Sequence, residues 1–280
     1  MSQVPLSGVL QRSLAILELL SAEPEGLALG VVAERLGLPR SATHRLLNEL
    51  VHYGYLRQPV DHGVYALTTK LVAMGLSFLG SSGIIDIAQP ILDRLAQVSG
   101  EFVRLSILDG DRLTWVARSQ GSRAGLRYDP EMGAAAAFSC TASGHAILQT
   151  MTDDEALLVV GRQGFGKVAD YGPNAPTTPT ALLKALKAAR KRGFSITIET
   201  FTPGMAAMAA PVRRRGQAPI GAISVAGPHV RLTEARMVAL GDELLRAAEE
   251  LAATADASPL LRRSRSRAEP HALTRIDEAD

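Results

Sequence analysis

The segment from residue 29 to residue 57 constrains the fold most, because its pattern is typical of two short helices joined by a tight turn. Val32 and Leu36 have the spacing that places one face of a helix against a core. Gly37 and Pro39 predict the end of this helix, since glycine adopts the left-handed conformation readily and proline cannot continue a helix. The pattern therefore predicts a first helix that ends at about residue 36.

A second helix is predicted directly after the turn, with Ser41 as the cap of its free amides. One side is apolar and is expected to face the core, through Ala42, Leu46, Leu50 and Val51. The other side carries polar residues at helical spacing, namely Ser41, His44, Arg45, Asn48 and His52. None of these is a carboxylate, and Arg, Asn and Ser are side chains that pair with DNA phosphates or base edges. A helical hairpin with a merely solvated face has the same composition, so this face alone leaves both interpretations open.

The residues after the second helix favour the DNA-binding interpretation. Residues 53–57 leave the helix, residues 63–67 return as a strand, and the Pro, Asp and Gly of a turn lie between them. Helix, turn, helix and hairpin in this order are typical of a winged helix-turn-helix, which inserts its second helix into the major groove. We therefore expect double-stranded operator DNA as a partner, with Arg45 and Asn48 at base edges. The full set of expected DNA-binding residues is Arg40, Ser41, Thr43, His44, Arg45, Asn48 and His62.

Length and composition limit the remaining classes of protein. A chain of 280 residues, of which 46% are apolar, can form two separate cores. The formal net charge of +2 indicates no broad cationic field, so a DNA contact must be local. A single cysteine, Cys140, argues against a disulfide framework and favours a reducing cytoplasm. The longest uncharged apolar stretch, residues 71–85, is shorter than the roughly 20 residues that a membrane span requires, so no membrane partner is expected.

The order of predicted elements divides the chain into four segments. Residues 7–67 are the winged helix-turn-helix domain. Residues 68–83 are a linker helix, whose Met and Leu stripe favours a dimer contact. Residues 84–253 contain helices and alternating strands, ending in one continuous helix from residue 233 to residue 251, and therefore predict an α+β domain. Residues 254–280 are rich in arginine and poor in apolar residues and are expected to be disordered.

Five separated blocks carry a resemblance to a known family. They are SLAILELL at 13–20, LGLPRSATHRLL at 36–47, TASGHAIL at 141–148, FTPG at 201–204 and AISVAGP at 222–228. Over residues 7–253 the chain resembles the IclR family of bacterial transcriptional regulators. The resemblance implies a winged helix-turn-helix joined by a linker helix to a GAF-like effector-binding domain. It also implies a ligand-responsive regulator that forms a homodimer or a dimer of dimers.

The resemblance also implies where a small-molecule effector binds. The pocket is expected between the loop that ends at Phe138, the helix that begins at Ala142, and the strands that hold Thr197 and Ala207. Family members that bind small keto acids tend to have an aspartate and a cysteine at the last two positions. A larger or more apolar organic acid is therefore expected here. The expected effector-binding residues are Tyr128, Phe138, Thr141, Ala142, Ser143, Thr197, Met205 and Ala207.

The helix predicted to begin at Ala142 favours a carboxylate ligand on physical grounds. The first amides of a helix have no partner within the helix and attract anions. The hydroxyls of Thr141 and Ser143 lie beside them, and Gly144 is expected to permit close approach of the ligand. A plain capped helix is the alternative interpretation of the same residues.

The sequence indicates no enzyme, metal or cofactor. Its six histidines are scattered and lack the spacing of a metal site. Residues 161–167 resemble the start of a P-loop, but Val168 occupies the position of the hydroxyl that binds magnesium. Cys140 and His145 are five residues apart, yet no third catalytic group is visible. The alternative function is a small-molecule sensor or enzyme built on the α+β domain, with the helix-turn-helix serving protein contacts.

Overall fold

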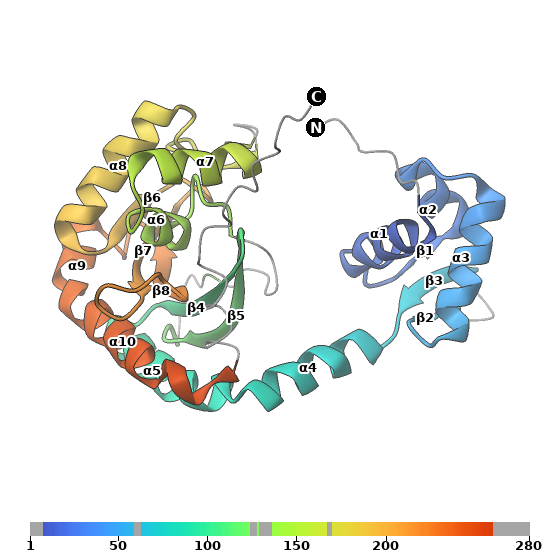
Figure 1. Ribbon diagram of the computed structural model, residues 1–280, viewed down its shortest axis with the longest axis horizontal. Coiled ribbons are helices and arrows are strands. Elements are labelled where there is room, and N and C mark those ends of the chain that lie inside the picture. Colours follow the sequence, from blue (N-terminus) through green and yellow to red (C-terminus); the bar gives the residue numbers. More distant parts are fainter. Residues whose placement is uncertain (1–7, 59–62, 124–127, 129–135, 167–169, 260–280) are drawn as a thin grey trace, which may run out of the picture. The chain divides into compact units, whose positions relative to one another are not determined.

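The computed structural model divides into two compact units, residues 1–81 and residues 82–280 (Figure 1). The residues that it describes are 8–58, 63–123, 128, 136–166 and 170–259. Among the described helices none is by itself long and apolar enough to cross a membrane, and α4 (Lys70–Ser82) with α5 (Ile84–Ser99) passes that test only as a pair broken at Gly83.

The first unit is a winged helix-turn-helix, as the sequence predicts. Its elements besides α4 are α1 (Val9–Ser21), β1 (Leu27–Ala28), α2 (Leu29–Leu36), α3 (Arg40–His52), β2 (Leu56–Arg57) and β3 (Val64–Leu67). Strand β3 lies between β1 and β2 and is antiparallel to both. The core is formed by apolar side chains from the helices and the sheet, namely Ile16, Leu20, Leu27, Val32, Leu46, Leu47, Leu50, Leu56 and Tyr65. This core fixes α3 with one face buried and the other exposed.

At the turn between α2 and α3, the predicted role of Gly37 is confirmed, whereas the predicted helix cap is not found. Gly37 has the left-handed conformation, with φ of 63°, and ends α2. Helix α3 begins at Arg40 with Pro39 as the N-cap residue, and no side chain caps it. The prediction that Ser41 caps the helix is therefore wrong. Ser41 already lies within the first turn, where the Pro39 carbonyl accepts the Thr43 amide at 3.0 Å.

Helix α4 exposes apolar side chains over much of its length. Val72, Met74, Leu76 and Phe78 are each at least 50% exposed, and Ser82 is the buried residue of this helix. The helix continues to Ser82, and Gly83, with φ of 62°, separates it from α5.

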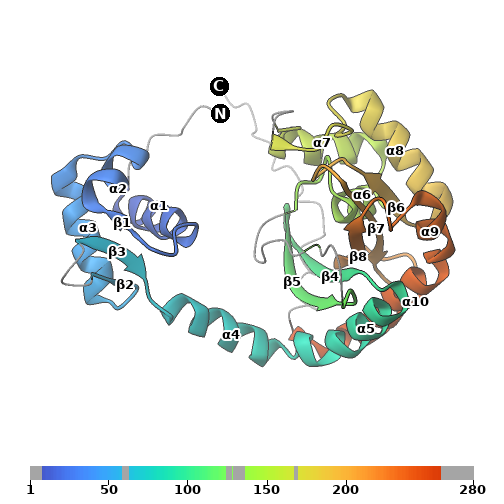
Figure 2. The same ribbon diagram turned by 180° about the vertical axis from the view of Figure 1, so that it is seen from behind.

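The second unit is an α+β domain of the GAF-like type around one five-stranded antiparallel sheet. After α5, its elements are β4 (Phe102–Asp109), β5 (Arg112–Gln120), α6 (Ala142–Leu148), α7 (Asp153–Gln163), α8 (Pro179–Arg192), β6 (Ser195–Ile198), β7 (Met205–Val212), β8 (Gly221–Pro228), α9 (Glu234–Ala239) and α10 (Gly241–Thr254). The strand order is β5-β4-β8-β7-β6. Helices α5 and α10 cover one face of the sheet, and α6 packs on the other face with α7 and α8 outside it (Figure 2).

Two expectations for the end of the chain are wrong. The single helix expected from residue 233 to residue 251 is broken at Leu240 into α9 and α10. A side chain at residue 241 would lie 2.7 Å from the Phe194 ring, so only glycine fits there. Glycine has a low helix propensity, which is consistent with a break at this point. Residues 254–258 are ordered rather than disordered, because a 3-10 turn (Ala255–Ala257) follows α10 and Ser258 is fully buried. The arginine cluster expected to be disordered lies outside the described residues.

Candidate DNA-reading helix and effector pocket

The polar side of α3 is exposed. Arg40, Ser41, His44, Arg45, Asn48 and His52 all belong to the exposed class. Asn48 and His44 are one turn apart, and the Asn48 amide nitrogen lies 3.3 Å from the His44 ring Nε2. Glu49 is exposed at the margin of this side, so the carboxylate-free surface is narrower than the sequence indicates. The surface offers several donors and acceptors around the Arg45 guanidinium.

Two of the residues expected at DNA do not belong to this exposed set. Thr43 is fully buried, and its hydroxyl donates to the Pro39 carbonyl at 3.1 Å. Its inclusion among the DNA-binding residues is therefore wrong, because a helical position three residues before Leu46 faces the core. His62, expected in the wing, lies outside the described residues.

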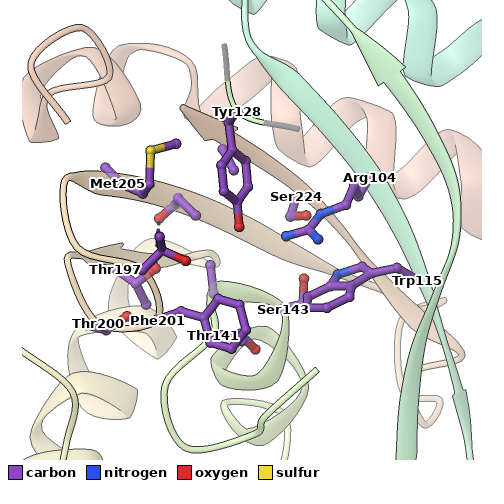
Figure 3. Close-up of a pocket in the computed structure, with 15 residues that line it drawn as sticks. Arg104, Trp115, Tyr128, Thr141, Ser143, Thr197, Thr200, Phe201, Met205 and Ser224 are labelled. Atoms are coloured by element: carbon purple, nitrogen blue, oxygen red, sulfur yellow. Dashed lines mark hydrogen bonds between the residues drawn. The ribbon is translucent and has the colours of Figure 1, made fainter. Parts of the chain in front are cut away.

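The second unit contains a pocket between the N-terminus of α6 and the sheet (Figure 3). Its empty space of about 410 Å³ includes open solvent at the mouth. Residues of β4, β5, β6, β7 and β8 form one side, and residues 200–202 close another. The described lining consists of Arg104, Trp115, Tyr128, Thr141, Ala142, Ser143, Thr197, Thr200, Phe201, Thr202, Met205, Ala206, Ala207, Ser224 and Ala226.

The pocket brings together every residue expected at the effector except Phe138. Phe138 is 1% exposed and packs in the core of the unit with Leu113, so its assignment as an effector-binding residue is wrong. Gly144 also has a role other than the expected one. A side chain there would lie 2.5 Å from the Phe138 Cα, which shows that this glycine permits close packing of the chain rather than approach of a ligand.

The part of the pocket that β4, β5 and β8 form was not predicted from the sequence. Strands β4 and β8 pair so that Arg104 lies opposite Ser224. The β5 residue Trp115 lies beside them, with the Arg104 Cζ 3.8 Å from its ring centroid. An arginine within the apolar strand Phe102–Asp109 was the available signal, since a charge at a buried strand position requires an explanation. The other missed lining residues are Thr200, Phe201, Thr202, Ala206 and Ala226.

Arg104 is the charged residue of the described lining. It is 5% exposed, and its Nε and Nη1 atoms have no hydrogen-bond partner among the described residues. Burial lowers the pKa of its guanidinium to about 10, although the nearby Tyr128 phenol acts in the opposite direction. At neutral pH the pocket therefore contains one cation and no described carboxylate.

A strained loop positions the aromatic wall opposite Arg104. Glu199 has φ of 53°, uncommon for a residue with a side chain, and its carboxylate accepts the Gly204 amide at 2.8 Å. The Thr200 hydroxyl donates to the Cys140 carbonyl. These contacts fix Phe201, whose ring centroid lies 6.2 Å from that of Trp115.

Cys140 and His145 are structural residues of the core. Burial raises the pKa of the Cys140 thiol to about 12, so it is protonated at neutral pH. The His145 ring is fully buried, its Nε2 lies 2.8 Å from the Ser139 carbonyl, and burial lowers its pKa. Within the described residues no three His, Cys, Asp or Glu side chains are grouped as a metal site requires. These two residues therefore do not support a catalytic pair in which the Cys140 thiol is the nucleophile and His145 the base.

The two units together define a class of protein, a DNA-binding regulator with a pocket in a separate α+β unit. Comparison with known proteins places it more narrowly. The family model for the IclR helix-turn-helix domain matches residues 9–59, and the model for the bacterial transcriptional regulator IclR C-terminal domain matches residues 76–253. The chain belongs to the IclR family of bacterial transcriptional regulators, which are not enzymes.

Individual relatives agree with this assignment. The acetate operon repressor of Salmonella typhimurium is 30% identical over 251 residues, which cover 88% of this chain and 90% of the relative. The crystal structure of an IclR regulator from Alicyclobacillus acidocaldarius has a TM-score of 0.75 at 21% identity and covers 90% of this chain and 98% of its own. An IclR homologue from Microbacterium hydrocarbonoxydans, crystallised with 4-hydroxybenzoate, has a TM-score of 0.71 at 23% identity, with coverage of 90% and 100%. These two likenesses concern the fold.

Proposed function

We propose that this regulator binds operator DNA as a homodimer or a dimer of dimers in the cytoplasm, and that an organic acid in the pocket controls its DNA affinity. The observation that carries the proposal is the exposed polar side of α3, held on the core of a winged helix-turn-helix. A helix in this position of the motif reads the major groove. The alternative, an enzyme or sensor whose helix-turn-helix serves protein contacts, has no comparable support in the family.

The side chains of α3 divide by the DNA contact that each would make. Arg45 and Asn48 are exposed at mid-helix, where they would reach base edges. Arg40 and Ser41 lie in the first turn, which is suited to phosphate contacts. His62 of the wing would add a further phosphate contact.

Exposed apolar residues of the first unit support a dimer. Val9, Leu10 and Leu14 of α1 are at least 50% exposed. Helix α4 exposes four further apolar side chains, including Leu76 at 64% and Phe78 at 50%. Apolar helix surfaces of this kind are suited to a second copy of the chain, and two copies would read a pseudo-palindromic operator.

The pocket supports control by a small molecule. Its lining combines a buried cation with aromatic and apolar side chains, and the crystallised homologue holds 4-hydroxybenzoate, an aromatic carboxylate. Control requires that the effector bind one DNA-binding geometry of the dimer better than another, since equal affinity for both would shift nothing. The pocket and the DNA-reading helix would then be coupled sites.

A gel-shift titration on the DNA upstream of the protein's own gene tests the proposal. It is run at two salt concentrations with unrelated DNA as competitor. We expect a specific shift that weakens with salt, because phosphate contacts release counterions. Binding no tighter than to unrelated DNA, both there and on DNA selected from random sequence, would contradict the proposal. In that case the sensor or enzyme alternative becomes the leading one.

A further inference from the structure

We propose that Arg104 is the carboxylate-binding residue of the pocket, and that the effector is a monocarboxylate whose acid group faces strand β4 while its aromatic or apolar body faces Phe201 and Met205. The inference rests on the proposed effector function and deepens it. The sequence predicted the first amides of α6 as the carboxylate site, whereas the structure favours the Arg104 side chain of β4.

The first observation is a buried guanidinium that has no counter-ion among the described residues. Arg104 is 5% exposed, and two of its nitrogens lack a hydrogen-bond partner among the described residues. Among the described residues the buried carboxylate is Glu101. It forms an ion pair with Arg231, with Nε 2.6 Å from Oε1, and does not line the pocket. Isolating a cation from water is costly unless it is paired, so this site is favourable for an anion that enters it.

Two more unpartnered polar groups lie at the same end of the pocket. The Trp115 indole nitrogen and the Ser224 hydroxyl are buried and have no hydrogen-bond partner among the described residues. Figure 3 shows the Arg104 guanidinium, the Tyr128 hydroxyl and the Ser143 hydroxyl directed toward one region, with Ser224 behind it. A carboxylate placed there would accept from the guanidinium in two parallel bonds and from neighbouring hydroxyls.

The rest of the lining is apolar or weakly polar. Phe201 and Met205 lie away from the Arg104 guanidinium in the close-up (Figure 3), and Ala207 adds a further apolar lining residue. A second charged group of the ligand would meet no described charged partner there. One cation at one end and an aromatic and apolar wall at the other therefore select a ligand with a single acid group.

Matched ligand pairs test the inference on the full-length protein. The probes are benzoate, 4-hydroxybenzoate, phenylacetate and hexanoate, each compared with its neutral amide. We expect at least one acid to raise the melting temperature and alter the gel shift, and its amide to bind about tenfold to a hundredfold more weakly, as loss of a charge-assisted pair implies. Equal binding of acid and amide, or no response to any of the acids, would overturn the inference.

Three variants locate the effect. Arg104→Gln should lose the same factor toward the acid and little toward the amide, and Arg104→Lys should restore part of the loss. Arg112→Gln, the same change at an exposed position of β5, should bind the acid as the wild type does. Because Arg104 has no described partner for two of its nitrogens, Arg104→Gln should melt within a few degrees of the wild type. If Arg104→Gln binds the acid with unchanged affinity, the assignment is wrong.

The gel shift separates this inference from the proposed function. Specific operator binding by wild type and Arg104→Gln alike supports the regulator even where the acid and amide bind equally. Release of the operator by an uncharged ligand would overturn the role of Arg104 and leave effector control intact. Loss of specific DNA binding by the wild type would count against the proposed function instead.

Discussion

The exposed side of α3 and the pocket behind α6 place functional chemistry in opposite environments. On α3, Arg45 and Asn48 project from a helix whose other side is the core, so each can change without disturbing the packing. In the pocket, Arg104 and Trp115 are themselves nearly buried. Binding and stability are therefore separable at the DNA-reading helix, whereas around the pocket a residue's contribution to the core must be distinguished from its contact with a ligand.

Phe138→Ala tests that distinction with the largest expected effect. Phe138 is 1% exposed in the core and does not line the pocket, so its truncation should lower the free energy of unfolding of the second unit by about 3–5 kcal/mol. Denaturant titration followed by the fluorescence of Trp115, the single tryptophan of the chain, measures this. Leu158→Ala, at an exposed position of the same unit, is the control and should change little. A small loss of stability together with a large loss of ligand affinity would show instead that Phe138 is an effector-binding residue.

Arg45→Ala tests the other side of the comparison. An exposed arginine at mid-helix should contribute to DNA affinity and not to the fold. We expect operator affinity to fall by about 1–3 kcal/mol, with relaxed preference at one base pair. Gel shifts on the operator and on single-base variants measure both changes, and the free energy of unfolding should stay within about 0.5 kcal/mol. Unchanged operator affinity would mean that another surface of the first unit reads the DNA.

The buried ring of His145 should make the stability of the second unit depend on pH, because the folded and unfolded chains bind its proton with different affinity. Burial lowers its pKa, so in the folded state it stays neutral as pH falls through about 6.5, while the unfolded chain takes up a proton. The free energy of unfolding should therefore decrease below that pH, with a slope of at most about 1.4 kcal/mol per pH unit for one proton. His145→Gln should show a smaller decrease between pH 7 and pH 5.5 in the same fluorescence titration. Parallel pH profiles for wild type and variant would assign the acid sensitivity to other groups.

Local pattern explains what the sequence could predict. Helical spacing and the glycine at residue 37 specify the helix-turn-helix, and alternation specifies the strands, because both signals involve residues close together in the chain. The pocket depends on strand pairing between β4 and β8, which joins Arg104 to a residue 120 positions later, Ser224, and no periodicity reports that register. The resemblance predicted the lining residues of α6 and also Thr197 and Ala207 of the neighbouring strands. It did not supply Arg104, and it placed Phe138 at the ligand when the phenyl ring packs into the core.

Thr43→Val has the smallest expected effect and tests the boundary between the two sides of α3. Thr43 is adjacent in sequence to His44, yet it is fully buried and donates its hydroxyl hydrogen bond within the helix. Valine keeps the branched shape and loses that bond, so the free energy of unfolding should fall by about 1 kcal/mol. Operator affinity, measured by gel shift beside Arg45→Ala, should change by less than about 0.5 kcal/mol. A loss comparable to that of Arg45→Ala, in a variant that remains folded, would show that α3 rotates or partly unwinds on DNA so that its present core side is presented to the groove.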